Sequence, residues 1–250
     1  SALSISPQGT YLTYSRSRNG LWVLPLKQED AVPRQLVNSW SGISYDWAPD
    51  DHWIVYSAAD DNFNYDVFVL NVDDPKMVTN ISGHPDNEGS PVWSKDGKTI
   101  AFVGRRIDDE VDIYYVPLTD SLHEQTKRDV ALQRALKANA ENLGGNENDN
   151  PSGDKKLEDS TEMGSKTVNA KALSLNLENI QRRLRQVSIP NVSESGLIWS
   201  PDSKTLMFSA EIDGKEGIFA ISPYNSSTPR LVLPVINPIQ AAVETYNKMA

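Results

Sequence analysis

Short runs of β-branched and aromatic residues, paired around tight polar turns, dominate the hydrophobic pattern of the chain. The clearest pair spans residues 198–208, where Ile198-Trp199 enters the turn Ser200-Pro201-Asp202-Ser203 and a second apolar run leaves it. Proline presets φ for such a turn, and the Ser and Asp side chains can bond the nearby backbone. The pattern predicts a strand–turn–strand unit.

The same unit occurs four times, at residues 4–14, 46–56, 92–102 and 198–208. Its repeated positions, which we expect to anchor the fold, are core tryptophans, turn prolines and turn aspartates: Trp47, Trp93, Trp199, Pro7, Pro49, Pro201, Asp50, Asp96 and Asp202. The first two intervals between equivalent turn positions are 42 and 46 residues, and the third is 106. Periods of ~40–45 residues with several short strands indicate propeller blades, so the third interval contains one blade and an insertion.

Each repeat also contains a third and, in three cases, a fourth β-rich run. The third runs are Leu21–Leu24, Asp66–Leu70, Asp112–Val116 and Gly217–Ile221, and the fourth are Pro33–Val37, Lys76–Asn80 and Pro229–Leu233. Because the repeat is regular along the chain, we predict an all-β fold, a β-propeller with four consecutive four-stranded blades that form part of a larger propeller. A stacked sandwich fits the regular period less well.

The predicted domain organisation is 1–118 for propeller blades, 119–190 for the insertion, 191–234 for a further blade and 235–250 for a C-terminal helix. Within the insertion, Ser121–Ala140 has a partial helical apolar stripe, and Gly144–Ser165 is too polar to order itself. Apolar residues return over Ala170–Val187, whose last part we expect to supply the outer strand of the interrupted blade. In the tail, Asn237-Pro238 has the form of a helix start.

Charge and composition exclude several classes of partner. The net charge of -10 and the pI of about 4.8 argue against nucleic acid and anionic membranes as partners. Because no cysteine is present, the sequence does not distinguish a periplasmic or other extracytoplasmic location from a cytoplasmic one. The sequence opens inside a repeat without methionine or signal peptide, and we expect it to be a piece of a longer protein.

The repeats resemble a known family. Trp199–Ser209 and Trp93–Phe102 are similar to the WD-like propeller repeat of the tricorn/TolB type, a resemblance that covers Ala2–Val116 and Ser195–Leu233. Ser174–Pro190 is also similar to an Asp-Leu/Phe-x-x-Ile-x-x-Arg segment that follows a charged insertion in tricorn-like serine peptidases, with Asn176 in place of the Asp. The resemblance implies a propeller that lies N-terminal to PDZ-like and catalytic domains.

No catalytic, cofactor or metal site is expected within this chain. A Gly-x-Ser-x-Gly elbow, a His-Glu-x-x-His pair and a glycine-rich phosphate loop are all absent. We interpret the histidines His52, His84 and His123 as solvated or structural. The acidic clusters (Asp60-Asp61, Asp73-Asp74 and Asp108–Asp112) lack the spacing of a calcium loop. Arg105-Arg106 and Arg182-Arg183 could bind a peptide carboxylate, but we expect surface ion pairs with nearby acids instead.

Three functions remain open at this point. The first is a non-catalytic propeller portion of a tricorn-like serine peptidase that guides or gates peptide substrates. The second is a free-standing TolB-type interaction propeller without an enzyme, and the third is the propeller of a prolyl-oligopeptidase-like enzyme. The partners considered are peptide or protein substrates, the downstream domains of the same chain and further copies in a homo-oligomer.

Overall fold

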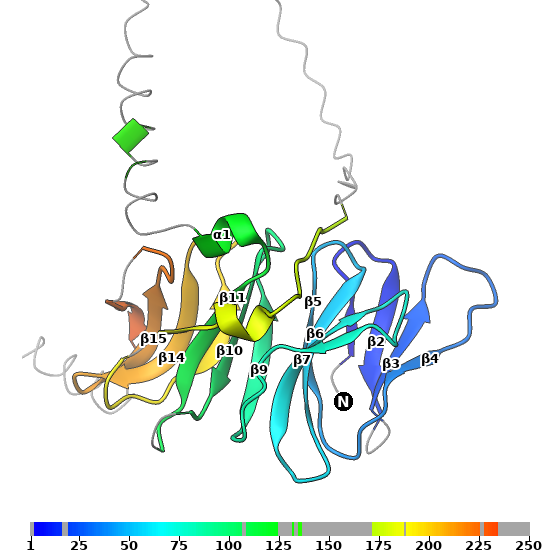
Figure 1. Cartoon of the computed structure of the whole chain (residues 1–250), viewed down its shortest axis with the longest axis horizontal. Coiled ribbons are helices and arrows are strands. Elements are labelled where there is room, and N and C mark those ends of the chain that lie inside the picture. The colour runs from blue at the N-terminus through cyan, green and yellow to red at the C-terminus, as the bar shows by residue number, and fades with distance from the viewer. Residues whose placement is uncertain are drawn as a thin grey trace, which may run out of the picture.

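The computed structural model describes residues 3–16, 20–106, 109–124, 132, 135–136, 172–187, 189–225 and 228–234. These residues form four antiparallel sheets of four strands each, which stand side by side (Figure 1). The arrangement confirms the predicted β-propeller, with each sheet forming one blade. Among the described residues, no helix is long and apolar enough to cross a membrane.

The blades take the strands almost in sequence order, and two short helices belong to the insertion. Blade 1 contains β1 (Leu3–Ile5), β2 (Tyr11–Ser15), β3 (Leu21–Pro25) and β4 (Arg34–Val37); blade 2 contains β5 (Ser44–Trp47), β6 (Trp53–Ala59), β7 (Tyr65–Asn71) and β8 (Val78–Asn80). Blade 3 contains β9 (Glu88–Trp93), β10 (Thr99–Gly104), β11 (Asp112–Pro117) and β12 (Arg185–Val187); blade 4 contains β13 (Ser195–Trp199), β14 (Leu206–Ile212), β15 (Lys215–Ile221) and β16 (Arg230–Pro234). The helices are α1 (Asp120–Glu124) and the 3-10 helix η1 (Ile180–Arg183).

The turn between the first two strands has one conformation in all four blades. In each, the N–H of the fourth turn residue donates to the carbonyl of the first, over 2.8–3.3 Å. The fourth residue has a left-handed φ in every case: 66° at Gly9, 63° at Asp51, 75° at Gly97 and 60° at Ser203. Glycine adopts this region without steric cost, and Asp or Ser adopts it with help from local hydrogen bonds.

Neighbouring blades meet in three seams, and each seam has its own hydrophobic core. The first strands lie together, since β5 contacts β9 and β9 contacts β13. One tryptophan per seam belongs to the core: Trp47 between blades 1 and 2, Trp93 between blades 2 and 3, and Trp199 between blades 3 and 4. All three indoles are buried, with exposed fractions of 6%, 1% and 3%. Equivalent repeat positions therefore make equivalent packing contacts.

Turns of adjacent blades also bond to each other across the seams. In the seam between blades 1 and 2, the N–H of Gln8 donates to Asp51 Oδ1 over 3.0 Å. In the seam between blades 3 and 4, the N–H of Asp96 donates to Ser203 Oγ over 2.8 Å. The middle seam has Gly97 at the accepting position, which offers no side chain. In this seam the return segment 172–187, which leads from the insertion back into blade 3, supplies a bond in place of the missing turn–turn bond. The N–H of Leu173 donates to Asp50 Oδ2 over 2.9 Å.

The two ends of the insertion are tied together where they leave and rejoin blade 3. The N–H of Asn176 donates to the carbonyl of Leu118 (2.9 Å), and its side-chain amide donates to both Asp120 oxygens (2.8 and 2.9 Å). The guanidinium of Arg183, which is 5% exposed, donates to the carbonyl of Asn176. Ile180 packs into the core between blades 2 and 3. We call this set of contacts the neck.

The return segment then completes blade 3 as the sequence predicts. Strand β12 pairs antiparallel with β11, with Val187 opposite Ile113. Strand β8 begins at Val78 rather than at Lys76, because the N–H of Met77 donates to the carbonyl of Asp74 in a turn. The expected disorder of Gly144–Ser165 and the helix over 235–250 lie outside the described residues, as does most of the predicted helix up to Ala140. The proposed domain boundaries stay a prediction.

Candidate functional site

A pocket of about 530 Å³ opens between blades 2 and 3, at the end of these blades opposite the turns at residues 48–51 and 94–97. It lies where β5 and β9 begin and where β6 and β10 end, so two first strands form part of its wall. Its lining combines hydroxyl, apolar and charged groups: Gly42, Ile43, Ser44, Ser57, Tyr65, Asn87, Glu88, Gly89, Ser90, Val103, Gly104, Arg105 and Val111.

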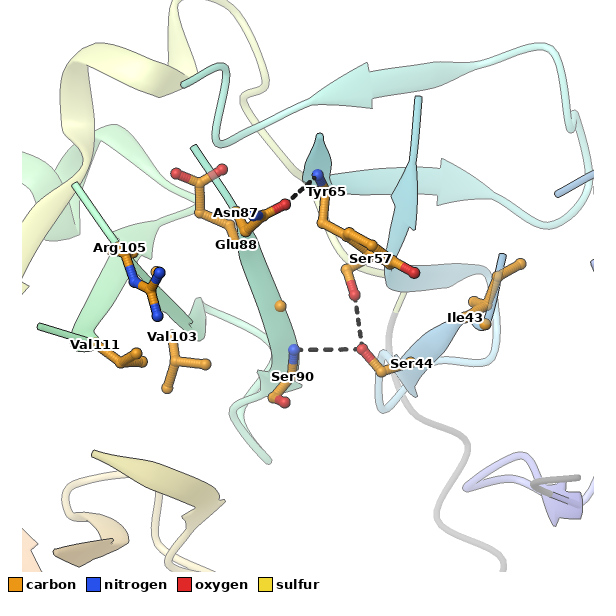
Figure 2. Close-up of a pocket in the computed structure, with 13 residues that line it drawn as sticks. Ile43, Ser44, Ser57, Tyr65, Asn87, Glu88, Ser90, Val103, Arg105 and Val111 are labelled. Carbon is orange, nitrogen blue, oxygen red and sulfur yellow. Dashed lines mark hydrogen bonds between the residues drawn. The ribbon is translucent and has the colours of Figure 1, made fainter. Parts of the chain in front are cut away.

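Three serines hold the two blades in register at this pocket (Figure 2). Ser44 Oγ and Ser57 Oγ are 2.7 Å apart, and the N–H of Ser90 donates to Ser44 Oγ over 3.3 Å. Ser90 has a left-handed φ of 51°, beside an irregularity in the pairing of β9 with β10 between Ala101 and Val103. A bulge of this kind redirects side chains and leaves backbone groups unpaired in the ladder. β9 is the edge strand of its sheet, and this bulge lies on the wall of the pocket.

Other polar contacts fix the wall of the pocket. The N–H of Tyr65 donates to Asn87 Oδ1 over 3.0 Å, as Figure 2 shows, and the N–H of Arg105 donates to the carbonyl of Asn87 over 3.2 Å. Asn87 thus joins blade 2 to two strands of blade 3. The Arg105 side chain is exposed and lies on the pocket wall, where its guanidinium can meet an anionic group.

Behind the pocket, a buried ion pair stabilises the seam. Arg106 Nε lies 3.0 Å from Glu88 Oε1, an ion-pair distance without the alignment of a hydrogen bond. Burial raises the pKa of Glu88 to about 7, and the charge of Arg106 opposes part of that rise. The same guanidinium lies 4.9 Å from the Tyr114 ring centroid and donates from Nη2 to the carbonyl of Ser82 over 2.9 Å. Arg106 therefore forms an ion pair as the sequence predicts, but with a buried glutamate rather than at the surface.

Gly104 makes room for this ion pair. A Cβ built on Gly104 would lie 2.7 Å from Glu88 Cγ, closer than real carbon contacts allow. The glycine at the end of β10 therefore lets the glutamate side chain lie flat across the seam.

The residues predicted as repeat anchors do not line this pocket. Pro7, Pro49 and Pro201 occupy the second position of their turns, and the three tryptophans are in the seam cores. Asp96 and Asp202 are exposed, and each accepts hydrogen bonds from the Ser side chain and a backbone N–H of its own turn. Asp50 differs because it is 5% exposed and bonds to the insertion.

The histidines contact acidic or backbone groups in the described part of the chain. His52 Nδ1 lies 2.5 Å from Asp73 Oδ2, and this hydrogen bond raises the pKa of His52. His84 Nδ1 accepts from the N–H of Asp86 over 3.3 Å and lies 3.6 Å from Glu88 Oε1. The backbone carbonyl of His123 in α1 accepts from Arg185 Nη2 over 2.6 Å.

Two of the acidic clusters act as turn caps, whereas in the third Asp112 is a buried residue of β11 and Asp108 lies outside the described residues. Asp60 Oδ1 accepts from the N–H groups of Asn62 and Asn64, which lowers the pKa of Asp60. Asp74 Oδ1 accepts from the N–H of Lys76 over 3.2 Å. Residues 3–16, 20–106 and the other described ranges contain no group of three or more His, Asp or Glu that could hold a metal ion.

Sequence reasoning missed the pocket and the buried glutamate, although one signal for Glu88 was visible. Glu88 precedes Trp93 by five residues, and Glu194 precedes Trp199 by the same five. A glutamate at the same position of two blades indicates a role between blades. It was missed because the repeated strand–turn–strand unit begins only after this position. The pocket lies beside the bulge at Ser90, where Gly89 and Pro91 flank the left-handed residue and mark an irregular strand.

No protein-family model matches the sequence, and no curated protein matches it significantly. Among solved structures, oligopeptidase B from Trypanosoma brucei matches with a TM-score of 0.55 and 11% identity over 94% of this chain and 27% of that one. The tricorn protease matches with a TM-score of 0.49 and 12% identity (99% and 28% covered), and TolB from Acinetobacter baumannii with 0.48 and 13% (92% and 40% covered).

The chain thus spans less than half of each of these solved chains. Identities of 11–13% carry information on the fold alone, and the oligopeptidase B match shows that this fold is a β-propeller. The chain is therefore a β-propeller, and its repeated strand–turn–strand units resemble those of the tricorn/TolB type.

Proposed function

We propose that this chain is the non-catalytic propeller portion of a tricorn-like serine peptidase, and that it guides or gates peptide substrates. The observation that supports this most is the pocket between blades 2 and 3, which combines a strand edge, small hydroxyls and an exposed arginine. Such a site suits an extended peptide, because main-chain groups pair with a strand edge and a side chain enters the pocket. A peptide carboxylate would lie against Arg105, whose planar guanidinium binds carboxylates in a bidentate manner.

The alternative is a free-standing TolB-type propeller that binds a protein partner at the same pocket without an attached enzyme. The two readings differ in what the complete gene encodes beyond Ala250. The peptidase reading requires PDZ-like and catalytic segments there, and the TolB reading requires the chain to end soon after its last blade. An α/β-hydrolase domain would instead favour a prolyl-oligopeptidase-like enzyme.

Peptide binding can be tested by filling the pocket. Fluorescein-labelled ten-residue peptides, with a free or an amidated C-terminus, would be titrated with the purified chain and followed by anisotropy. We expect Ser44→Trp to weaken binding at least about tenfold, since 1.4 kcal/mol of lost contact corresponds to a factor of ten. The matched control is Ser195→Trp, an exposed serine that also begins the first strand of its blade but lies outside the pocket.

The arginine is tested in the same assay. Arg105→Ala should weaken the free-carboxylate peptides and leave the amidated peptides unchanged. Equal affinity of the wild type and Ser44→Trp, or no binding of any peptide, would contradict the proposed role of the pocket.

A further inference from the structure

Blades 3 and 4 bury a glutamate at the same position of the repeat. Glu88 and Glu194 each stand five residues before the core tryptophan, and each is 1% exposed. Both are followed two residues later by a left-handed residue, Ser90 or Gly196, beside an irregularity in the strand pairing. The two seams therefore place a carboxyl group in the same structural setting.

Only one of the two carboxyl groups has a cation next to it. In the seam between blades 2 and 3, Arg106 is 3.0 Å from Glu88. The residue that corresponds to Arg106 in blade 4 is Ile212, which packs against the apolar core of the seam between blades 3 and 4. In the part of the chain that the structure describes, neither carboxyl oxygen of Glu194 has a hydrogen-bond partner, and no ion pair involves it.

Among the described residues, the charged groups that act on Glu194 are Asp112 and Glu110 of blade 3, and both are acidic. Asp112, the first residue of β11, is 4% exposed, and Glu110 lies just before it. The backbone brings these residues together, because the N–H of Glu194 donates to the carbonyl of Val111 over 2.9 Å. A negative Glu194 would therefore lie buried beside other negative groups without compensation, which costs far more than burying the neutral acid.

We propose that the seam between blades 3 and 4 is a proton-dependent joint, in which Glu194 must be protonated for the two blades to pack closely. Ionisation of Glu194 loosens blade 4 from blade 3, whereas in the sister seam Arg106 offsets part of the cost of a charged Glu88, so that this seam loosens less. The joint would let pH change how firmly blade 4 is held, independently of what the pocket binds.

The direction of the pH effect follows from the pKa of Glu194. Burial, reinforced by the charges of Asp112 and Glu110, raises this pKa from 4.5 to about 8. The closed seam then holds the proton more tightly than the open one. Stability is fully present below the unfolded value of 4.5, is lost as pH rises, and stops falling above about 8. Within that window the opening constant rises by nearly a factor of ten per pH unit.

The test is hydrogen exchange between pH 5.5 and 9 on the whole chain, with rates corrected for intrinsic exchange. In the wild type we expect the opening constant of β13 and β14 to rise about a hundredfold from pH 5.5 to 7.5. Glu194→Gln, which is permanently neutral, should remove that rise, and Glu194→Met provides a second neutral side chain should the amide disturb folding. Glu211→Gln, an exposed glutamate of β14, should keep the wild-type profile.

The same experiment can overturn the proposal in two ways. A pH profile that is the same in the wild type and in both neutral variants would show that Glu194 does not operate the seam. Exchange that rises equally in all four blades would show global unfolding rather than a joint. A direct readout is the side-chain carboxyl ¹³C resonance of Glu194, which should titrate near pH 8; titration near 4.5 would contradict the proposal.

Discussion

At the scale of single residues, the seams show how one substitution changes the chemistry of a repeat position. The carboxyl group five residues before the core tryptophan is kept in blades 3 and 4, while Arg106 in one blade corresponds to Ile212 in the other. A buried charge is tolerated only with a partner of opposite charge. Glu88 can therefore stay ionised beside Arg106, whereas Glu194 must be neutralised by a proton. Whether a cation lies next to the glutamate therefore decides its role, and its position in the repeat does not.

Removing the cation should make the Glu88 seam behave like the Glu194 seam. In Arg106→Met the buried Glu88 loses its arginine partner, so we expect the free energy of unfolding to fall by about 3 kcal/mol at pH 8.5. At pH 5 the loss should be smaller, because Glu88, whose pKa is already raised by burial, can then take up a proton. Urea denaturation at the two pH values measures both.

The double variant Glu88→Gln/Arg106→Met is the control for lost packing. It removes both charges and should recover most of the stability at pH 8.5. An equal loss of stability at pH 5 and pH 8.5 in Arg106→Met would mean that packing of the guanidinium, and not the charge of Glu88, accounts for the effect.

At the scale of elements, one turn conformation serves four different environments. The left-handed fourth residue is Asp51 or Ser203 where its side chain bonds the preceding blade, and it is Gly97 where the insertion passes over the turn. A Cβ on Gly97 would lie 2.4 Å from Leu173 Cδ2, whereas a Cβ on Gly9 meets nothing within 4 Å. Position 97 in blade 3 therefore requires glycine for space, because Leu173 of the insertion lies against it, as well as for its positive φ.

These two glycines give a matched pair of substitutions. Gly97→Ser and Gly9→Ser carry the same cost of placing a side chain at positive φ, but only Gly97→Ser displaces Leu173. We expect Gly97→Ser to be less stable than Gly9→Ser by about 1 kcal/mol, the lower end of overpacking costs, because the leucine end can shift. Thermal denaturation of both variants measures the difference, and equal melting temperatures would contradict a packing role for Leu173.

The neck predicts how the insertion can be shortened. Among the described residues, its contacts join 118–124 to 172–187 and, through Ile180, to the core between blades 2 and 3. Replacing residues 125–171 with a short Gly-Ser linker should therefore change the free energy of unfolding by less than about 1 kcal/mol. Asn176→Ala should destabilise the shortened and the full chain alike, since it removes the bonds to both Asp120 oxygens. A shortened chain that fails to fold would show that the replaced residues support the blades.

At the scale of the whole molecule, the sequence predicts the blades well because their signals are local. The polar turn and the apolar pairs on either side of it are readable within one repeat, and the period follows from comparing successive repeats. Strand β12 follows from counting strands in the interrupted blade. The pocket and the buried carboxyl groups arise between repeats. Glu88 meets Arg106 only after β9 and β10 pair, and Glu194 meets Asp112 only after two blades pack, so neither environment can be read from residues near in sequence.

The whole chain should bind peptides without hydrolysing them. Acyl transfer needs an activated nucleophile, a base within ~3 Å of it and an oxyanion site. The pocket serines bond to each other and to backbone N–H, while His52 pairs with Asp73 and His84 lies near Glu88. We therefore expect no turnover of fluorogenic peptides and no labelling by serine-directed phosphonates. Stoichiometric labelling that disappears on mutating one serine would place a catalytic site inside the propeller, and Ser44, Ser57 and Ser90 would be the first to test.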